Sequence, residues 1–135
     1  MLQGACSQLP VMALAPKKGE RVLDVSCAPG GKTTHMAALM RNSGTLVAND
    51  ANKERQKSTI ANLHRLNCCN SIVSVMDGRD LAKTWGLYFN KVLLDAPCSG
   101  TEGERIKSLK NVAHYTLTNY KILDTNWFRE LDSKF

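Results

Sequence analysis

The stretch from Asp24 to Thr33 contains two adjacent glycines and is the part of the sequence most suited to binding a ligand. It follows the apolar run Val22–Val25 and precedes a segment with helical periodicity, so it predicts a strand, a turn and a helix. Gly30 and Gly31 tolerate positive φ and carry no Cβ that would keep a ligand away from the backbone. The N–H groups that open the next helix point toward whatever lies above the turn. We therefore expect a ligand site here.

An aspartate lies near the carboxyl end of each of four predicted strands. These residues are Asp24, Asp50, Asp77 and Asp95. One aspartate after a strand is ordinary turn chemistry. Four on neighbouring strands indicate a pocket, because ligands of open α/β sheets bind above the carboxyl ends of the strands. Asp50 follows Gly31 by nineteen residues, near the ~20-residue offset at which an acid reaches ribose hydroxyls.

Three nucleotide ligands compete for such a turn. Gly31-Lys32-Thr33 ends the P-loop pattern G-x-x-x-x-G-K-[ST], but Ser26 stands where the first glycine is required. The turn also departs from G-x-G-x-x-G, which disfavours a nicotinamide nucleotide. S-adenosylmethionine has no phosphate and carries a sulfonium and an ammonium cation, so surrounding carboxylates suit it. We place this methyl donor ahead of ATP, and ATP ahead of NAD.

A second informative stretch, Asp95–Gly100, follows the strand predicted at 91–94, where a substrate base would reach the donor. A thiolate of Cys98 could add to C6 of a pyrimidine and make C5 electron-rich enough to accept a methyl group. A structural Pro-Cys turn with an idle thiol explains the same residues equally well.

The elements that must position these residues alternate between strand and helix. The expected strands are 22–25, 45–48, 72–76 and 91–94, and the expected helices are 32–41 and 51–66. A short helix with Pro10 in its first turn is expected before them. The alternation predicts an α/β fold, a parallel sheet with helices on both faces and right-handed crossovers. A terminal helix is expected over 117–131, where Tyr120, Leu123, Trp127 and Leu131 share a helical face.

Composition limits the class of protein. The 135 residues are typical of a single domain, and 43% hydrophobic content argues against disorder. No apolar run approaches the ~20 residues of a membrane-spanning helix, and the first residues lack signal-peptide features, so we expect an intracellular protein. The charge of +6 favours a polyanionic partner. The five cysteines lack C-x-x-C spacing, so no zinc site or disulfide frame is indicated.

Several segments closely resemble the NSUN/RsmB-type RNA cytosine-5 methyltransferases, most of all the nucleolar branch that acts on large-subunit ribosomal RNA. They are Leu2–Ala5, Leu9–Pro16, Cys27–Thr33, Ala48–Asn52, Asn62–Leu66, Asp77–Arg79 and Leu93–Gly100. The likeness covers residues 2–100. It implies a Rossmann-like methyltransferase fold, S-adenosylmethionine as cofactor, ribosomal RNA as partner, a role in large-subunit biogenesis, and a location in the nucleolus.

The resemblance also implies which residues bind the donor. They are Ser26, Cys27, Ala28, Pro29, Gly30, Gly31, Lys32, Asp50, Asp77 and Asp95, with Arg55 as a further basic residue of the site. In this family the attacking cysteine lies in a later Thr-Cys-Ser segment, and the cysteine that matches Cys98 assists and is linked to product release. The sequence holds no cysteine after Cys98, so we expect catalysis by the usual route to fail unless Cys98 takes over the attack.

The tail departs from the family pattern. Glu102 interrupts the expected Ser-Gly-Thr-Gly, and residues 104–135 do not resemble the family. We therefore expect residues 1–135 to form one incomplete domain, with a sheet that ends after the fourth strand and a diverged tail over 101–135. The alternative to an enzyme is a catalytically inactive RNA-binding or assembly module that retains the cofactor-binding fold.

Overall fold

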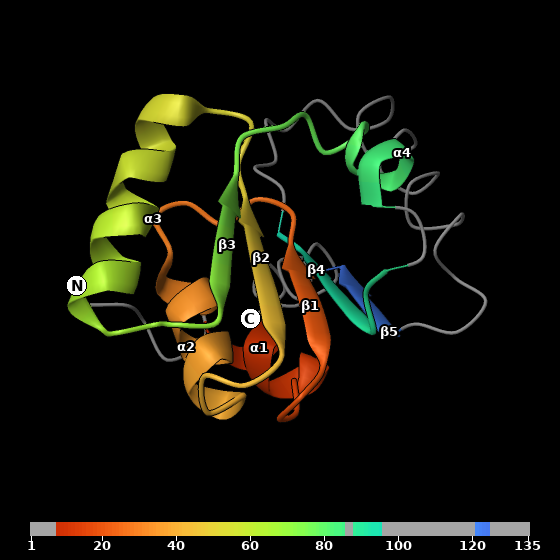
Figure 1. The fold of residues 1–135 in the computed structure, drawn as a ribbon. Coiled ribbons are helices and arrows are strands. Elements are labelled where there is room, and N and C mark those ends of the chain that lie inside the picture. Colours follow the sequence, from red (N-terminus) through yellow and green to blue (C-terminus); the bar gives the residue numbers. More distant parts are fainter. Residues whose placement is uncertain (1–7, 86–87, 96–120, 125–135) are drawn as a thin grey trace, which may run out of the picture.

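A parallel five-stranded sheet forms the centre of the computed structural model, which describes residues 8–85, 88–95 and 121–124. The strands are β1 (Arg21–Asp24), β2 (Thr45–Asn49), β3 (Ser71–Ser74), β4 (Lys91–Leu94) and β5 (Lys121–Asp124). They lie in the order β3-β2-β1-β4-β5, and every neighbouring pair is parallel (Figure 1). The predicted α/β class with a parallel sheet is confirmed.

Helices cover both faces of this sheet (Figure 1). They are α1 (Leu9–Leu14), α2 (Gly31–Leu39), α3 (Lys53–Arg65) and α4 (Leu81–Trp85). Val22, Leu46 and Leu93 pack with apolar side chains of α1 and α2 on one face. Their immediate neighbours Leu23 and Val47 pack with Leu81 and Phe89 on the other face. This alternation is the period of two of a β-strand, with both of its faces buried.

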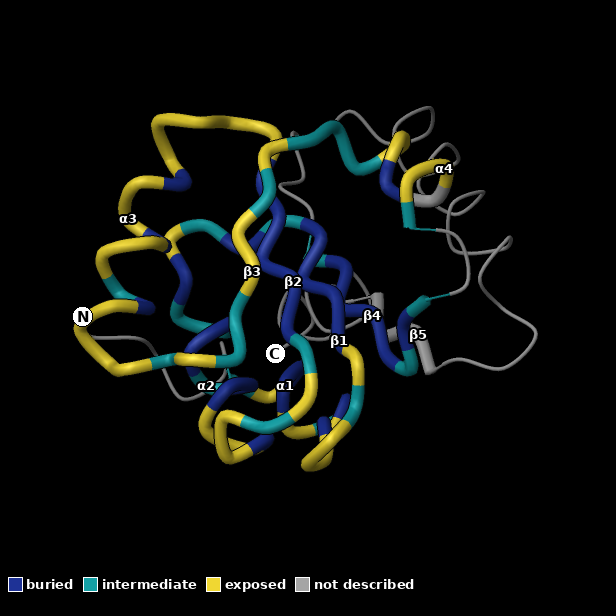
Figure 2. The backbone as a smooth tube through the Cα atoms, in the orientation of Figure 1, coloured by how far each residue is buried: buried dark blue, intermediate teal, exposed yellow. Residues whose placement is uncertain are grey.

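Burial differs across the sheet. Figure 2 shows β1 and β2 largely buried, whereas β3, at one edge, is mostly exposed or half-buried. The apolar side chains of Ile72 and Val73 in β3 are 47% and 37% exposed. The core therefore lies on both faces of β1, β2 and β4, and the residues that follow these strands continue from a well-packed part of the sheet. Among the described residues, no helix is long and apolar enough to cross a membrane.

The boundaries of α3 follow from its cap. The side-chain oxygen of Asn52 accepts hydrogen bonds from the N–H groups of Glu54 at 2.9 Å and Arg55 at 3.2 Å. Asn52 is therefore the N-cap, and the helix begins at Lys53 rather than at residue 51 as predicted. The other helices and strands predicted before residue 100 are present, with ends that differ from the predicted ones by at most two residues, and α4 was not predicted.

The prediction of a helix over 117–131 is wrong for residues 121–124, which form β5. Ile122 and Leu123 pair with Val92 and Leu93 of β4, so the sheet does not end after the fourth strand. The physical reason is that β4 would otherwise leave a row of backbone N–H and C=O groups without partners at a buried edge. The rest of the predicted helix, Trp127 included, lies outside the described residues.

Candidate functional site

The turn between β1 and α2 is held at its base by the neighbouring strands. The N–H of Val25 donates to the carbonyl of Leu93 at 3.0 Å, and the N–H of Cys27 donates to the carbonyl of Asn49 at 2.8 Å. Gly30 then closes the turn, with its N–H donating to the carbonyl of Cys27 at 2.7 Å. The turn is thus a fixed continuation of the sheet at the carboxyl ends of its strands.

Gly30 is required for two reasons. Its φ is +100°, in the left-handed region that side chains disfavour. A Cβ at this position would also lie 3.0 Å from the Cα of Thr59 in α3. Gly31 was expected to use the same freedom, but it begins α2 as an ordinary helical residue. The turn can therefore approach α3 closely because residue 30 is a glycine.

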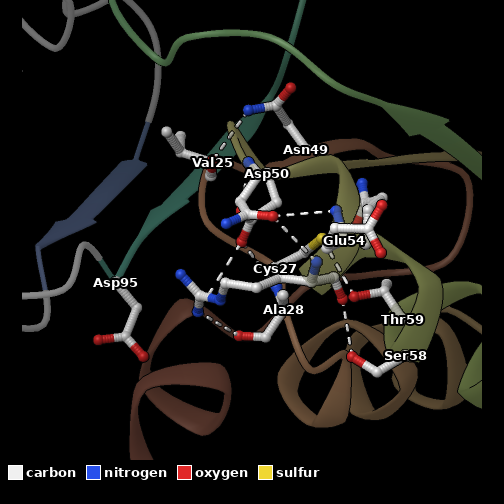
Figure 3. A network of polar contacts seen from close by, with 12 residues as sticks. Val25, Cys27, Ala28, Asn49, Asp50, Glu54, Ser58, Thr59 and Asp95 are labelled. Atoms are coloured by element: carbon white, nitrogen blue, oxygen red, sulfur yellow. Dashed lines mark hydrogen bonds and ion pairs between the residues drawn. The ribbon is translucent and has the colours of Figure 1, made fainter.

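Asp50, at the end of β2, contacts the turn directly (Figure 3). Its carboxylate accepts hydrogen bonds from the N–H of Ala28 at 3.3 Å and of Asn52 at 2.9 Å. The guanidinium of Arg55 lies 4.0 Å from the same carboxylate and donates to the carbonyl of Ala28 at 3.2 Å. Asp50 and Arg55 thus hold the two polar backbone groups of Ala28.

An ion pair joins the start of α2 to the end of β4. The ammonium of Lys32 lies 2.6 Å from the carboxylate of Asp95, and both side chains are mostly buried. Lys32 lies in the first turn of α2, so this ion pair holds Asp95 close to the turn between β1 and α2. Asp95 and Asp50 therefore lie on the same edge of the sheet, as the sequence predicted.

Asp24 is buried beneath the turn between β1 and α2 and does not lie on its exposed side. The residue is 1% exposed, and the hydroxyl of Thr33 donates to its carboxylate at 2.8 Å. Burial, together with the nearby charge of Asp95, raises the pKa of Asp24 from 3.8 to about 7, although the Thr33 hydrogen bond and the charge of Lys32 oppose this. Through its hydrogen bond with Thr33, the side chain of Asp24 joins the end of β1 to the first turn of α2.

The remaining predicted site residues lie in different parts of the chain. Ser26 and Ala28 are half-buried and Pro29 is exposed on the turn. Asp77 follows β3 and pairs with the guanidinium of Arg79, so the structure places it at the same end of the sheet but with a partner of its own. Cys98 lies outside the described residues.

Cys27 directs its side chain toward α3. The thiol donates to the side-chain oxygen of Gln56 at 3.0 Å and lies 3.6 Å from the hydroxyl of Thr59. Burial raises the pKa of this thiol to about 12, so it stays protonated at neutral pH and is not a nucleophile. Its role in the turn is packing and hydrogen bonding.

Sequence reasoning missed Asn49, which precedes Asp50 and is fully buried. Its amide nitrogen donates to the carbonyls of Val25 and Met76, both at 3.0 Å. Its oxygen accepts from the hydroxyl of Ser74 at 2.7 Å and from the N–H of Met76 at 3.0 Å. One side chain thereby joins the ends of β1, β2 and β3. An amide on an otherwise apolar strand was the available signal.

Gln56 was missed for a similar reason. It is 1% exposed on α3, and its amide nitrogen donates to the carbonyls of Ala48 and Ser74, both at 2.8 Å. With its oxygen it accepts the thiol hydrogen of Cys27. Gln56 therefore fixes α3 to two strands and to the turn. The signal was a polar residue in line with the buried Thr59 and Leu63 of the same helix.

Comparison with known proteins supports the family to which the sequence pointed. The model of the family described as 16S rRNA methyltransferase RsmB/F matches residues 11–127, which extends the likeness beyond residue 100, where the sequence resemblance ended. A human "28S rRNA (cytosine(4447)-C(5))-methyltransferase" is 63% identical over 101 residues, which are 75% of this chain and 12% of that protein. A "25S rRNA (cytosine-C(5))-methyltransferase nop2" of Schizosaccharomyces pombe is 56% identical, again over 75% of this chain and over 17% of its own length.

Comparison with solved structures points to the same family. The structure titled NSun6 from Pyrococcus horikoshii with SFG is 36% identical, has a TM-score of 0.67, and is matched over 84% of this chain and 31% of its own. The protein PH0851 has a TM-score of 0.74 at 32% identity, over 90% of this chain and 31% of its own. This chain therefore spans less than a third of the length of each of these four proteins. By the match of more than half its residues to the family model, the chain belongs to the RsmB/F family of rRNA cytosine-5 methyltransferases, which use S-adenosylmethionine.

Proposed function

We propose that this chain is the S-adenosylmethionine-binding part of an enzyme that methylates C5 of cytosine in large-subunit ribosomal RNA. The observation that carries the proposal is the arrangement around Ala28. Asp50 and Arg55 hold its N–H and C=O groups at the carboxyl end of the sheet, where ligands of open α/β folds bind. The buried carboxylate of Asp50 starts beside the turn and can accept hydrogen bonds from two ribose hydroxyls.

The charges at the turn favour a cationic ligand without phosphate. The two cations nearest the turn are already engaged, Lys32 with Asp95 and Arg55 with Asp50. A triphosphate would have to break these pairs, whereas the sulfonium and ammonium of S-adenosylmethionine meet carboxylates. The residues proposed to bind the donor are Ser26, Cys27, Ala28, Pro29, Gly30, Gly31, Lys32, Asp50, Asp77 and Asp95.

The substrate and location are proposed from the relatives. Those of human, mouse, Caenorhabditis elegans and Schizosaccharomyces pombe are named for 28S, 26S or 25S rRNA methylation. A role in large-subunit biogenesis and a nucleolar location are consistent with those names, and the charge of +6 suits a nucleic-acid partner. The second candidate is a non-catalytic RNA-binding module, since a net charge of +6 suits binding to a polyanion without any chemical step.

Titration calorimetry with S-adenosylhomocysteine, the product of the donor, tests the proposed cofactor site. We expect the full chain to bind it and Asp50→Ala to weaken binding about a hundredfold, because two charge-assisted hydrogen bonds are worth about 3 kcal/mol or more. The matched control is Asp80→Ala, which removes an exposed aspartate paired with Lys83 and should leave the affinity unchanged.

Absence of binding to the folded chain would contradict the cofactor assignment, as would equal binding by Asp50→Ala. Binding of ATP that depends on Mg²⁺ would favour a nucleotide-phosphate site instead. The two candidate functions are separated by incubation with ribosomal RNA and labelled donor. Label transfer supports the enzyme, and binding without transfer supports the non-catalytic module.

A further inference from the structure

One face of α3 contacts the cofactor turn along its whole length from Cys27 to Gly30. The α3 residues that make these contacts are Arg55, Gln56, Thr59 and Asn62. Their spacing places them on one side of a helix. The turn thus rests on α3, and each of its residues has a partner there.

The peptide between Pro29 and Gly30 is held at both of its ends. The side-chain nitrogen of Asn62 donates to the carbonyl of Pro29 at 2.8 Å, and the N–H of Gly30 donates to the carbonyl of Cys27 at 2.7 Å. Because a peptide unit is planar, fixing its oxygen and its N–H fixes the direction of the whole unit. This unit ends at Gly30, the N-cap residue that precedes α2.

A neighbour on α3 sets the orientation of the Asn62 amide. The guanidinium of Arg65 lies 3.1 Å from the side-chain oxygen of Asn62. A guanidinium has donors only, so it selects the amide oxygen and turns the amide nitrogen toward Pro29. The Asn62 donor is therefore directed at the turn by contacts within the chain itself.

We propose that Asn62 is a positioning residue for cofactor binding, acting through the Pro29–Gly30 peptide. This inference rests on the proposed function, since it concerns the same turn. With the Asn62 contact present, the N–H groups that open α2 face one direction before any ligand arrives. Without this contact, the turn also adopts orientations that do not bind the ligand. The apparent dissociation constant then rises in inverse proportion to the fraction of molecules whose turn is in the binding orientation.

The test compares Asn62→Ala with Asn70→Ala in the full chain. Asn70 is a matched control because its side-chain nitrogen also donates to a backbone carbonyl, that of Ser43 at 3.3 Å. Both Ser43 and Asn70 precede strands, so this contact lies at the amino-terminal end of the sheet, opposite the turn. Asn62→Gln retains an amide donor on a longer arm.

Two readouts are needed, the dissociation constant of S-adenosylhomocysteine and the hydrogen-exchange rate of the Gly30 N–H in the ligand-free chain. We expect Asn62→Ala to raise both about tenfold and Asn62→Gln to recover most of the loss. Asn70→Ala should lower the urea midpoint without changing either readout.

The proposal is overturned if Asn62→Ala leaves Gly30 exchange unchanged, or if Asn70→Ala accelerates it equally. It is also overturned if Gly30 exchange rises while the affinity stays at the wild-type value. If the unmutated chain binds no S-adenosylhomocysteine, the proposed function fails and the role of Asn62 in ligand binding fails with it. The exchange measurement then still decides whether Asn62 orders the turn.

Discussion

Replacing Asn49 with alanine is expected to lower the free energy of unfolding by about 4 kcal/mol. The variant leaves the carbonyls of Val25 and Met76, the N–H of Met76 and the hydroxyl of Ser74 without the amide that each contacts. A buried polar group that loses its partner costs about 1–3 kcal/mol. Four such groups exceed what repacking or entering water can recover. Urea unfolding monitored by circular dichroism measures the loss.

The matched control for this variant is Asn90→Ala. Asn90 accepts one hydrogen bond, from the N–H of Arg21 at 2.9 Å, so about 1 kcal/mol should be lost. If Asn49→Ala lowers the free energy of unfolding by no more than Asn90→Ala does, the side chain of Asn49 does not hold the ends of β1, β2 and β3 together.

Asp24→Asn is expected to remove a pH dependence of stability worth about 4 kcal/mol. The pKa of Asp24 is about 7 in the folded chain against 3.8 as the ordinary value, so between these values the folded state binds one more proton than the unfolded state. Stability therefore falls as pH rises from about 4 to 7 and stays low above pH 7. The asparagine keeps an oxygen for the Thr33 hydroxyl and carries no charge, so the variant should be the more stable form at pH 8.

The measurement is urea unfolding at pH 5 and pH 8 for both proteins. Asp80→Asn is the control, because it removes a charge from an exposed aspartate and should leave the pH profile as it is in the unmutated chain. A wild-type stability that rises from pH 5 to pH 8, or a profile that Asp24→Asn leaves unaltered, would contradict a buried Asp24 carboxyl with a pKa of about 7.

The sheet was predictable where the sequence pattern was long and had a single explanation. The runs that became β1, β2 and β4 are apolar on both faces, which is typical of a central parallel strand. The start of α3 could have been placed correctly as well, because Asn52 is a favourable cap. Apolar periodicity alone does not fix the ends of a helix.

The tail could not be predicted because its local pattern and its partner disagree. Tyr120, Leu123 and Trp127 have helical spacing, but Lys121–Asp124 pairs with the free edge of β4. Whether a short apolar run becomes a strand depends on whether a sheet edge is open beside it. That information belongs to the assembled fold, and a window of sequence does not contain it.

The sequence predicted where the candidate site residues lie on the sheet better than it predicted the directions of their side chains. The turn, Asp50 and Asp95 were placed correctly at one edge of the sheet, since parallel strands bring their carboxyl ends together. The side chains of Asp24 and Cys27 instead point into the protein. Neither direction follows from residue type, because both depend on Thr33 and Gln56 lying within hydrogen-bond distance.

We propose above all that the turn from Ser26 to Lys32, with Asp50 beside it, binds S-adenosylmethionine. A crystal structure of the chain with S-adenosylhomocysteine tests it most directly. We predict the ligand above Pro29–Gly31, with its ribose hydroxyls on the carboxylate of Asp50. A ligand bound anywhere else on the chain would contradict the account.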